Sequence, residues 1–155
     1  AETDVRPMGR DTQGVRGINL KSGDRVVGMI SFPKEPLKDA GSRLRPFQDV
    51  LLITERGLGK RTAVHEFPLQ HRGGIGVKAA KLTDKTGKLV AAKLVDHHTD
   101  QVIITSKKAQ VIKLPLKNIK RIGRDTQGVI LMRFAKQADT VAAVTTVDKN
   151  AEQDI

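Results

Sequence analysis

The chain has 155 residues, enough for one domain with its own hydrophobic core. Its 28 Lys and Arg residues against 17 Asp and Glu give a formal net charge of +11, which favours a polyanionic partner, nucleic acid before an acidic membrane surface; a solubilising charge without a partner is the alternative. The chain has no Cys, which excludes disulfides and cysteine chemistry, and it has no apolar run long enough to span a membrane.

The first predicted elements are a Gly-rich turn and two strands. Residues 9–15 read Gly-Arg-Asp-Thr-Gln-Gly-Val, and the alternating residues that follow predict a strand over 15–20. A second strand is predicted over 24–29. Residues of about 31–48 carry three prolines and predict an inserted surface loop.

The same order of elements then returns twice along the chain. In the second passage, strands are predicted over 50–54 and 59–64, with a turn between them. A looser copy of the Gly-rich turn follows over 71–77, and two more strands are predicted over 77–82 and 88–93. In the third passage, strands are predicted over 101–105 and 110–114, and an unchanged copy of the seven-residue turn follows over 123–129. Two more strands are predicted over 129–134 and 139–144. The last glycines of the three turns, Gly14, Gly76 and Gly128, are 62 and 52 residues apart.

Four short strands in a repeat of about fifty residues predict an all-β, propeller-like array with one four-stranded sheet, or blade, in each repeat. We expect about three blades, with repeats around residues 1–30, 24–82 and 88–144. They form a single domain over residues 1–147, followed by a short polar tail over 148–155.

The Gly-rich turns have a structural interpretation first, because glycine permits a positive φ and a close approach of two backbones. The alternative role of their amides is to hold a phosphate. The predicted structural glycines are Gly14, Gly57, Gly59, Gly73, Gly74, Gly76 and Gly128.

Three arginines, Arg10, Arg72 and Arg124, hold the same place in the three turns. A cation repeated at blade spacing puts positive charge at intervals around a rim that a bent duplex can follow. The alternatives are an ordinary solvated face and an arginine that braces the turn. The scarcity of aromatic residues argues against single-strand binding by base stacking. The predicted phosphate contacts, which strengthen binding without reading sequence, are Arg10, Arg16, Lys60, Arg61, Arg72, Lys78, Lys107, Lys108, Lys113 and Arg124.

The sequence contains no convincing catalytic motif. The segment from Gly57 to Arg61 is not a phosphate-binding loop, because Thr54 stands where that loop needs its first Gly and Arg61 where it needs Ser or Thr. His97 and His98 are adjacent, so on a strand they point to opposite sides and do not form a metal site. We predict no metal, no cofactor and no catalysis by this chain alone.

The repeated motifs resemble the C-terminal DNA-wrapping domain of the DNA gyrase A subunit. The resemblance covers roughly residues 5–147 and rests on residues 9–18, 23–29, 54–62 and 104–113, with Leu58 in the aromatic position of that family's Gly-aromatic-Gly-Lys-Arg turn. It implies a β-pinwheel whose blades exchange strands and whose basic rim wraps duplex DNA, supporting negative supercoiling by a type IIA topoisomerase. The implied partners are double-stranded DNA, the rest of the gyrase A protein and the gyrase B protein, in the bacterial cytoplasm at the nucleoid and with no membrane. The strand-cleaving tyrosine and the ATPase lie elsewhere.

Two departures from the family pattern keep other interpretations open. The family's Gln-Arg-Arg-Gly-Gly-Lys-Gly box survives only in degraded form at residues 70–76, which indicates the C-terminal part of such a domain. It also leaves the related topoisomerase IV C-terminal domain, which holds DNA without strong chiral wrapping, as an alternative. A propeller-like protein-interaction platform with incidental charge is the third hypothesis.

Overall fold

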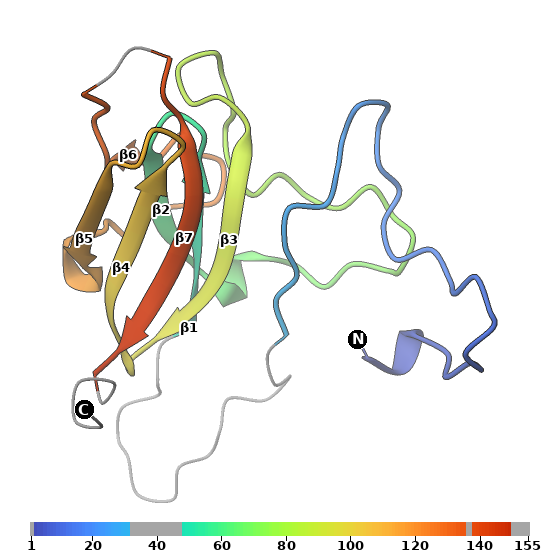
Figure 1. Cartoon of the computed structure of the whole chain (residues 1–155). Helices are drawn as coiled ribbons and strands as arrows, with labels where there is room; N and C mark the ends of the chain where they lie inside the picture. The colour runs from blue at the N-terminus through green and yellow to red at the C-terminus, as the bar shows by residue number, and fades with distance from the viewer. Residues whose placement is uncertain (1, 32–47, 136–137, 150–155) are drawn as a thin grey trace, which may run out of the picture.

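The computed structural model describes residues 2–31, 48–135 and 138–149 (Figure 1). Within these residues every regular element is a β-strand or a short 3-10 turn, so the predicted all-β class is confirmed. The strands are β1 (Gln48–Thr54), β2 (Leu58–Ala63), β3 (Leu89–Asp96), β4 (Thr99–Ser106), β5 (Val111–Pro115), β6 (Val129–Ile130) and β7 (Val141–Asp148). The 3-10 turns are η1 (Glu2–Asp4), η2 (Val64–Glu66) and η3 (Leu116–Asn118).

The strands form two antiparallel sheets, in the orders β3-β1-β2-β6 and β5-β4-β7. Each sheet is built on a hairpin, β1–β2 or β4–β5, and the next long strand pairs with the hairpin's first strand. Leu51 lies opposite Arg61 and Lys93, and the residue 52 positions later, Ile103, lies opposite Lys113 and Thr145. The repeat of 52 residues in the sequence therefore gives the two sheets the same register between paired strands. β3 and β7 contact each other where the two sheets meet (Figure 1).

The core lies between the two sheets and is made of β-branched and other aliphatic side chains. Strand alternation turns one face of each strand inward. The buried apolar cluster draws on both hairpins and on the segments that follow them: Leu51, Ile53, Val95, Val102, Ile104, Leu116, Ile119, Met132, Val141 and Val144. Full burial of one such side chain contributes about 1.5–3 kcal/mol, so this cluster is the main source of stability.

The two sheets are interlocked by a strand exchange. After the second hairpin the chain runs back to the first sheet, where β6 pairs with β2 through Leu58–Ile130 and Gly59–Val129. It then returns to the second sheet as β7. Neither repeat can therefore separate without breaking the other's sheet, which is the pinwheel arrangement.

Several predicted strands take a different form. No strand forms over 15–20, 24–29 or 77–82, and the strand predicted over 129–134 is only two residues long. Isolated bonds hold these segments, such as the amide of Asn19 to the carbonyl of Gly74, and Gly28 lies against the Ala92 carbonyl of the edge strand β3 without forming a ladder with it. A strand needs a continuous ladder, so correct alternation alone does not produce one. Residues 2–31 thus contribute no sheet, and β5 has no outer neighbour within the described ranges.

The predicted insertion and tail fall largely beyond the described part of the chain. Of the loop predicted at about 31–48, residues 32–47 lie outside the described residues, and so do residues 150–155 of the tail. Asp148 ends β7, and the amide of Lys149 donates to the carbonyl of His98. No helix in the described ranges has the length and apolar character needed to cross a membrane.

Candidate nucleic-acid interface

The two identical turns have the same internal geometry. In the first, the hydroxyl of Thr12 donates to the carbonyl of Gly9 at 2.9 Å, and in the second the hydroxyl of Thr126 donates to the carbonyl of Gly123 at 2.7 Å. A threonine side chain that bonds a nearby backbone group is a standard way to close a turn. The local sequence therefore fixes this shape in both places.

The turns at residues 71–77 and 123–129 are each held to a segment of the preceding repeat. The guanidinium of Arg72 donates to the carbonyl of Arg16 at 3.1 Å, and that of Arg124 donates to the carbonyl of Lys78 at 2.6 Å. The backbone repeats the pattern: Asn19 donates to Gly74, and Lys81 donates to Thr126. Arg72 and Arg124 therefore brace the joints between successive repeats.

This bracing brings cations together at each joint. We call Arg16, Arg72, Lys78 and Arg124 the junction cations, two at each of the two joints. Arg16, Arg72 and Lys78 are exposed, and Arg124 is half-buried. A guanidinium has five N–H donors, so the one bond described for Arg72 or Arg124 leaves donors for a phosphate. Arg10, which holds the same place in the first turn, is also exposed.

Lys60 is a correction to the predicted phosphate contacts. Its side chain is only 1% exposed, and its ammonium donates to the carbonyls of Gly123 and Arg124 and to the hydroxyl of Thr126. Burial, the largest influence, lowers the pKa of Lys60, and the carboxylates of Glu66 and Asp125 oppose that change. The ammonium of Lys60 is enclosed by the turn at residues 123–129. Lys60 therefore holds that turn and cannot reach DNA in this conformation.

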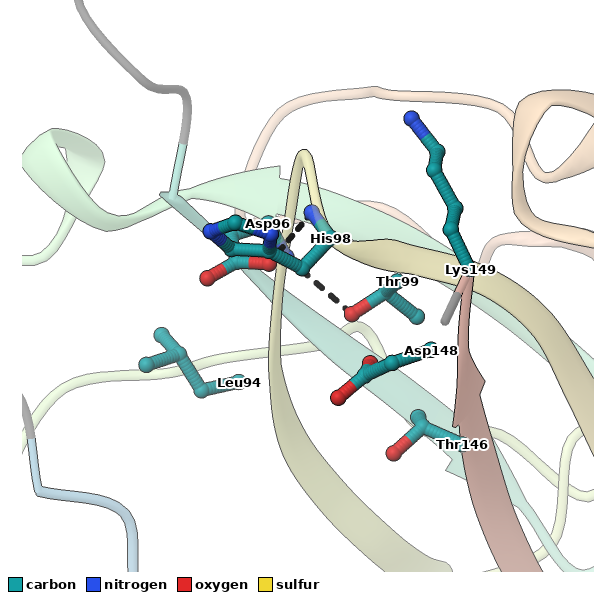
Figure 2. Close-up of a pocket in the computed structure, with 7 residues that line it drawn as sticks. All are labelled: Leu94, Asp96, His98, Thr99, Thr146, Asp148 and Lys149. Atoms are coloured by element: carbon teal, nitrogen blue, oxygen red, sulfur yellow. Dashed lines mark hydrogen bonds between the residues drawn. The ribbon is translucent and has the colours of Figure 1, made fainter. Parts of the chain in front are cut away.

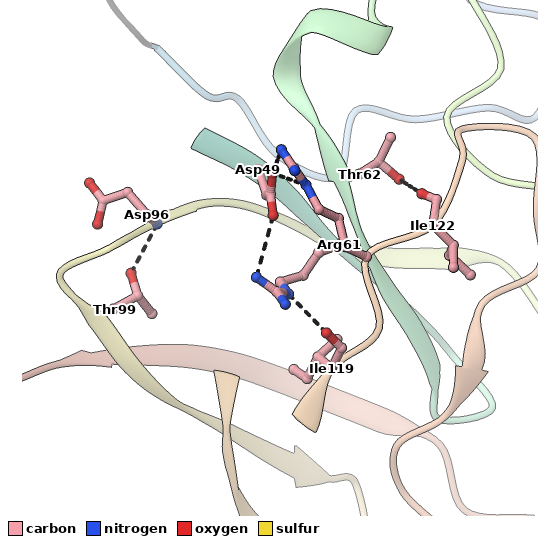
Figure 3. A network of polar contacts seen from close by, with 8 residues as sticks. Asp49, Arg61, Thr62, Asp96, Thr99, Ile119 and Ile122 are labelled. Atoms are coloured by element: carbon pink, nitrogen blue, oxygen red, sulfur yellow. Dashed lines mark hydrogen bonds and ion pairs between the residues drawn. The ribbon is translucent and has the colours of Figure 1, made fainter. Parts of the chain in front are cut away.

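Arg61 is likewise engaged inside the protein. Its guanidinium donates to the carbonyl of Ile119 at 2.9 Å and pairs with the fully buried carboxylate of Asp49 at 3.4 Å (Figure 3). Arg121 pairs with the other oxygen of Asp49 at 2.8 Å and keeps 46% of its side chain exposed. Two guanidinium groups compensate one buried charge, as burial of a carboxylate requires. Arg61, with 15% exposure, is mainly a structural residue.

The predicted cations of the second hairpin lie toward the surface. Lys107 and Lys108 form the β4–β5 turn, and Lys113 lies on β5, all three exposed. The turn is held by the buried carboxylate of Asp139, which accepts hydrogen bonds from the Ser106 hydroxyl and the Lys108 amide. Burial raises the pKa of Asp139, but these bonds and the Thr140 amide outweigh it and lower that pKa below its ordinary value.

The predicted glycines divide into tightly packed and open positions. Gly57 has φ +77°, and a Cβ on it would overlap the carbonyl oxygen of Met132. A Cβ on Gly128, just before β6, would meet the carbonyl oxygen of Gly59 at 2.7 Å, and a Cβ on Gly59 would meet the side chain of Leu131 at 2.5 Å. The remaining predicted glycines, Gly14, Gly73, Gly74 and Gly76, meet no atom closer than 3.3 Å, and all but Gly74 have positive φ.

Sequence reasoning did not identify the carboxylates that organise this interface. Glu66 accepts the amide of Arg124 at 3.1 Å and so fixes the backbone of a junction cation. Asp49 orients Arg61 and Arg121. A sequence signal existed for Lys60: the residue 52 positions later is Ile112, which indicates an inward position in both hairpins.

A cavity of about 400 Å³ lies between the ends of β3 and β7, near the β3–β4 turn (Figure 2). It is lined by polar groups that bond to their own turn: the amide of His98 donates to Asp96 at 2.9 Å, and Thr99 accepts from the Asp96 amide. In the described ranges no three His, Cys, Asp or Glu side chains gather in a way that could hold a metal ion.

The repeat geometry is matched by comparison with known proteins. The model of the family described as DNA gyrase C-terminal domain, beta-propeller, matches residues 1–33, 48–96 and 100–148. The chain belongs to this family. The DNA gyrase A protein of Staphylococcus epidermidis is 38% identical over 152 residues, covering 97% of this chain, and that of Staphylococcus aureus is 37% identical over 153 residues, covering 99%.

Solved structures of this family and of a related one share the fold. A DNA gyrase A C-terminal domain is 27% identical, with a TM-score of 0.74 over 92% of this chain and 44% of that structure. The C-terminal domain of a DNA topoisomerase IV, 20% identical, gives a TM-score of 0.78 over 96% of this chain and 42% of that structure, a likeness of fold alone. The chain spans 16% of the length of the two staphylococcal relatives.

Proposed function

We propose that this chain is a duplex DNA-binding module of a gyrase A protein, and that it contributes to wrapping DNA for supercoiling by the whole enzyme. The observation that carries the proposal is the repeated pair of junction cations: Arg16 with Arg72, and Lys78 with Arg124. Their spacing follows the repeats, so successive joints offer positive charge along one path. Membership of the family and the net charge of +11 support the same conclusion.

In this proposal the phosphate contacts are revised from those predicted. The exposed cations Arg10, Arg16, Arg72, Lys78, Lys107, Lys108 and Lys113 remain, together with the half-buried Arg124. Lys60 and Arg61 serve to hold the joint. Contacts of this kind act on the phosphate backbone, so binding should depend strongly on salt and weakly on sequence.

The module catalyses nothing by itself in this proposal. The chain contains no Tyr, so the strand-cleaving residue belongs to another part of the enzyme. The proposal also assigns the ATPase to another part of the enzyme. Its partners are double-stranded DNA, the rest of the gyrase A protein and the gyrase B protein, in the bacterial cytoplasm. Residues 1–147 act as one domain of three repeats, and Asp148, predicted as the first residue of the tail, extends this domain as the end of β7.

Ligation of a nicked plasmid in the presence of the chain tests the wrapping. A positive shift in linking number that grows with protein concentration supports gyrase-type wrapping by this part alone. Salt-sensitive binding in a gel-mobility assay without any shift means that the chain binds DNA but does not wrap it by itself. Neither binding nor a shift contradicts the proposal and favours a protein-interaction platform.

One observation favours a topoisomerase IV-type module as the second candidate. In the degraded box, Ile75 stands where the gyrase box has its lysine, and 73% of its side chain is exposed. An exposed apolar residue there gives no charge to a bent duplex. A module of that type would bind plasmid DNA with salt sensitivity but leave the linking number unchanged even when residues 70–76 are replaced by the intact box.

A further inference from the structure

The two hairpins align residue for residue with an offset of 52, but they face different surroundings. The outer strand of the first hairpin, β2, carries the turn and strand of the next repeat. The outer strand of the second, β5, is the edge of its sheet among the described residues, and Val111 on it is 59% exposed. The first hairpin therefore shows what docking of a following repeat requires, and the second can be compared with it.

Two glycines of the first hairpin allow the backbone of the next repeat to approach. The carbonyl of Gly57 accepts hydrogen bonds from the amides of Leu131 at 2.8 Å and Met132 at 3.1 Å. Gly59 lies against Gly128, where a Cβ on Gly128 would meet the carbonyl oxygen of Gly59 at 2.7 Å. The first contact leaves no space for a side chain on Gly57, and the second leaves none on Gly128; a Cβ on Gly59 would meet the side chain of Leu131 at 2.5 Å.

Three side chains of the first hairpin satisfy backbone groups of the incoming turn. The ammonium of Lys60 donates to the carbonyl of Gly123 at 2.8 Å, and the hydroxyl of Thr62 donates to the carbonyl of Ile122 at 2.9 Å. Glu66 accepts the amide of Arg124. Lys60 and Thr62 are buried, so their loss would leave carbonyl oxygens without partners, which is costly. We call Gly57, Gly59, Lys60, Thr62 and Glu66 the acceptor positions.

The second hairpin has a different residue at every acceptor position. The equivalents, 52 positions later, are Ala109, Val111, Ile112, Leu114 and Asn118. The changes remove both glycines, both side-chain donors and the carboxylate. A segment placed there as residues 122–132 are placed on the first hairpin would bring its equivalent of the Met132 carbonyl oxygen into overlap with the Cβ of Ala109. The turn carbonyls that Lys60 and Thr62 satisfy on the first hairpin would also lack their donors.

We propose that the outer edge of β5 ends the repeat array, because the second hairpin does not accept the Gly-Arg-Asp-Thr-Gln-Gly-Val turn. This is independent of DNA binding and of what precedes or follows the chain. The copy of the turn at residues 9–15 is identical to the docked copy, so it fits acceptor positions. The acceptor positions on the first hairpin are occupied by residues 123–129 of the same chain, and this holds in every copy. A second copy of the chain therefore offers only its second hairpin, which lacks the acceptor residues. Copies of this chain therefore do not join head to tail.

Restoring the acceptor positions in the second hairpin tests this. The variant carries Ala109→Gly, Val111→Gly, Ile112→Lys, Leu114→Thr and Asn118→Glu, and its molar mass is measured by sedimentation equilibrium over a wide range of concentrations. We expect the wild-type chain to keep the mass of one molecule and the variant to gain mass with concentration. Gly14→Ala in the variant should reverse the gain, since Gly14 has open space in the single chain but its docked equivalent, Gly128, does not.

Two results would overturn the proposal. One is a wild-type chain that associates and loses that association with Gly14→Ala, since β5 would then accept the turn without the five residues. The other is a variant that melts cooperatively yet keeps the mass of one molecule. Should the five changes prevent folding, the wild-type chain with and without Gly14→Ala still decides the question.

Discussion

Gly59 and Gly128 lie with their backbones in contact, and a Cβ on Gly128 would meet the carbonyl oxygen of Gly59 at 2.7 Å. One glycine belongs to the outer strand of the first hairpin and the other ends the turn of the next repeat. The contact is a point of close approach between successive repeats, and it allows β6 to pair with β2. The strand exchange therefore depends on the absence of a side chain at Gly128.

This contact predicts different effects for the same substitution in the two copies of the turn. Gly14 and Gly128 both have positive φ, +75° and +88°, so Gly→Ala strains the backbone by about 1–2 kcal/mol at either position. Nothing lies within 4 Å of a Cβ on Gly14. Gly128→Ala should lower the free energy of unfolding by a further ~1–3 kcal/mol through overpacking. Urea denaturation of the two variants measures the difference, and equal losses would show that the close approach does not matter.

Lys60 should matter for stability and not for DNA contact. Lys60→Met keeps the apolar stem of the side chain but removes the ammonium that donates to three acceptors in the turn at residues 123–129. A hydrogen bond from a charged group contributes about 1.5–3 kcal/mol, so we expect a loss on the order of 2 kcal/mol in the free energy of unfolding. The control is Lys85→Met, an exposed lysine for which no change in unfolding is expected. A normal unfolding midpoint in Lys60→Met together with weaker DNA binding would contradict the structural role.

The lowered pKa of Asp139 predicts that the free energy of unfolding falls in acid. This pKa is lower in the folded chain than in the unfolded chain, so the folded state binds fewer protons. The contribution is therefore present above the ordinary Asp pKa and is lost as pH falls through the lowered value. Asp139→Asn should be less stable at neutral pH and flatter in acid, measured as urea midpoints against pH. The control Asp84→Asn should retain the wild-type profile; a wild-type profile in Asp139→Asn would refute the assignment.

The hairpins could be predicted from sequence because their signals are local. Strand alternation and the glycines of the first turn define β1 and β2, and the third repeat restates the pattern. Residues 15–20 and 77–82 alternate equally well, yet no strand forms, because pairing needs a neighbouring edge that the local sequence does not reveal. The burial of Lys60 depends in the same way on a turn 63 residues away in the chain. The roles of residues at a joint between two repeats are thus the hardest to predict from the sequence of one repeat.

The junction cations allow the DNA-binding proposal to be tested without disturbing the fold. Arg72 and Arg124 donate to the backbone carbonyls of Arg16 and Lys78, so the side chains of Arg16 and Lys78 can be changed while those acceptors remain. Arg16→Gln with Lys78→Gln should keep the wild-type unfolding midpoint. Arg72→Gln with Arg124→Gln should lose both stability and DNA affinity, since these side chains brace the joints.

The most direct measurement is the salt dependence of duplex binding by the wild-type chain and by the Arg16→Gln, Lys78→Gln double variant, with Arg133→Gln as the control for an exposed arginine outside the joints. Each lost phosphate contact lowers the slope of log affinity against log salt by about 0.9. We predict that the double variant binds every duplex sequence more weakly, with a slope smaller by about two contacts, while the control is unchanged. An unchanged slope in the double variant would show that the junction cations do not hold the DNA backbone and would contradict the proposed interface.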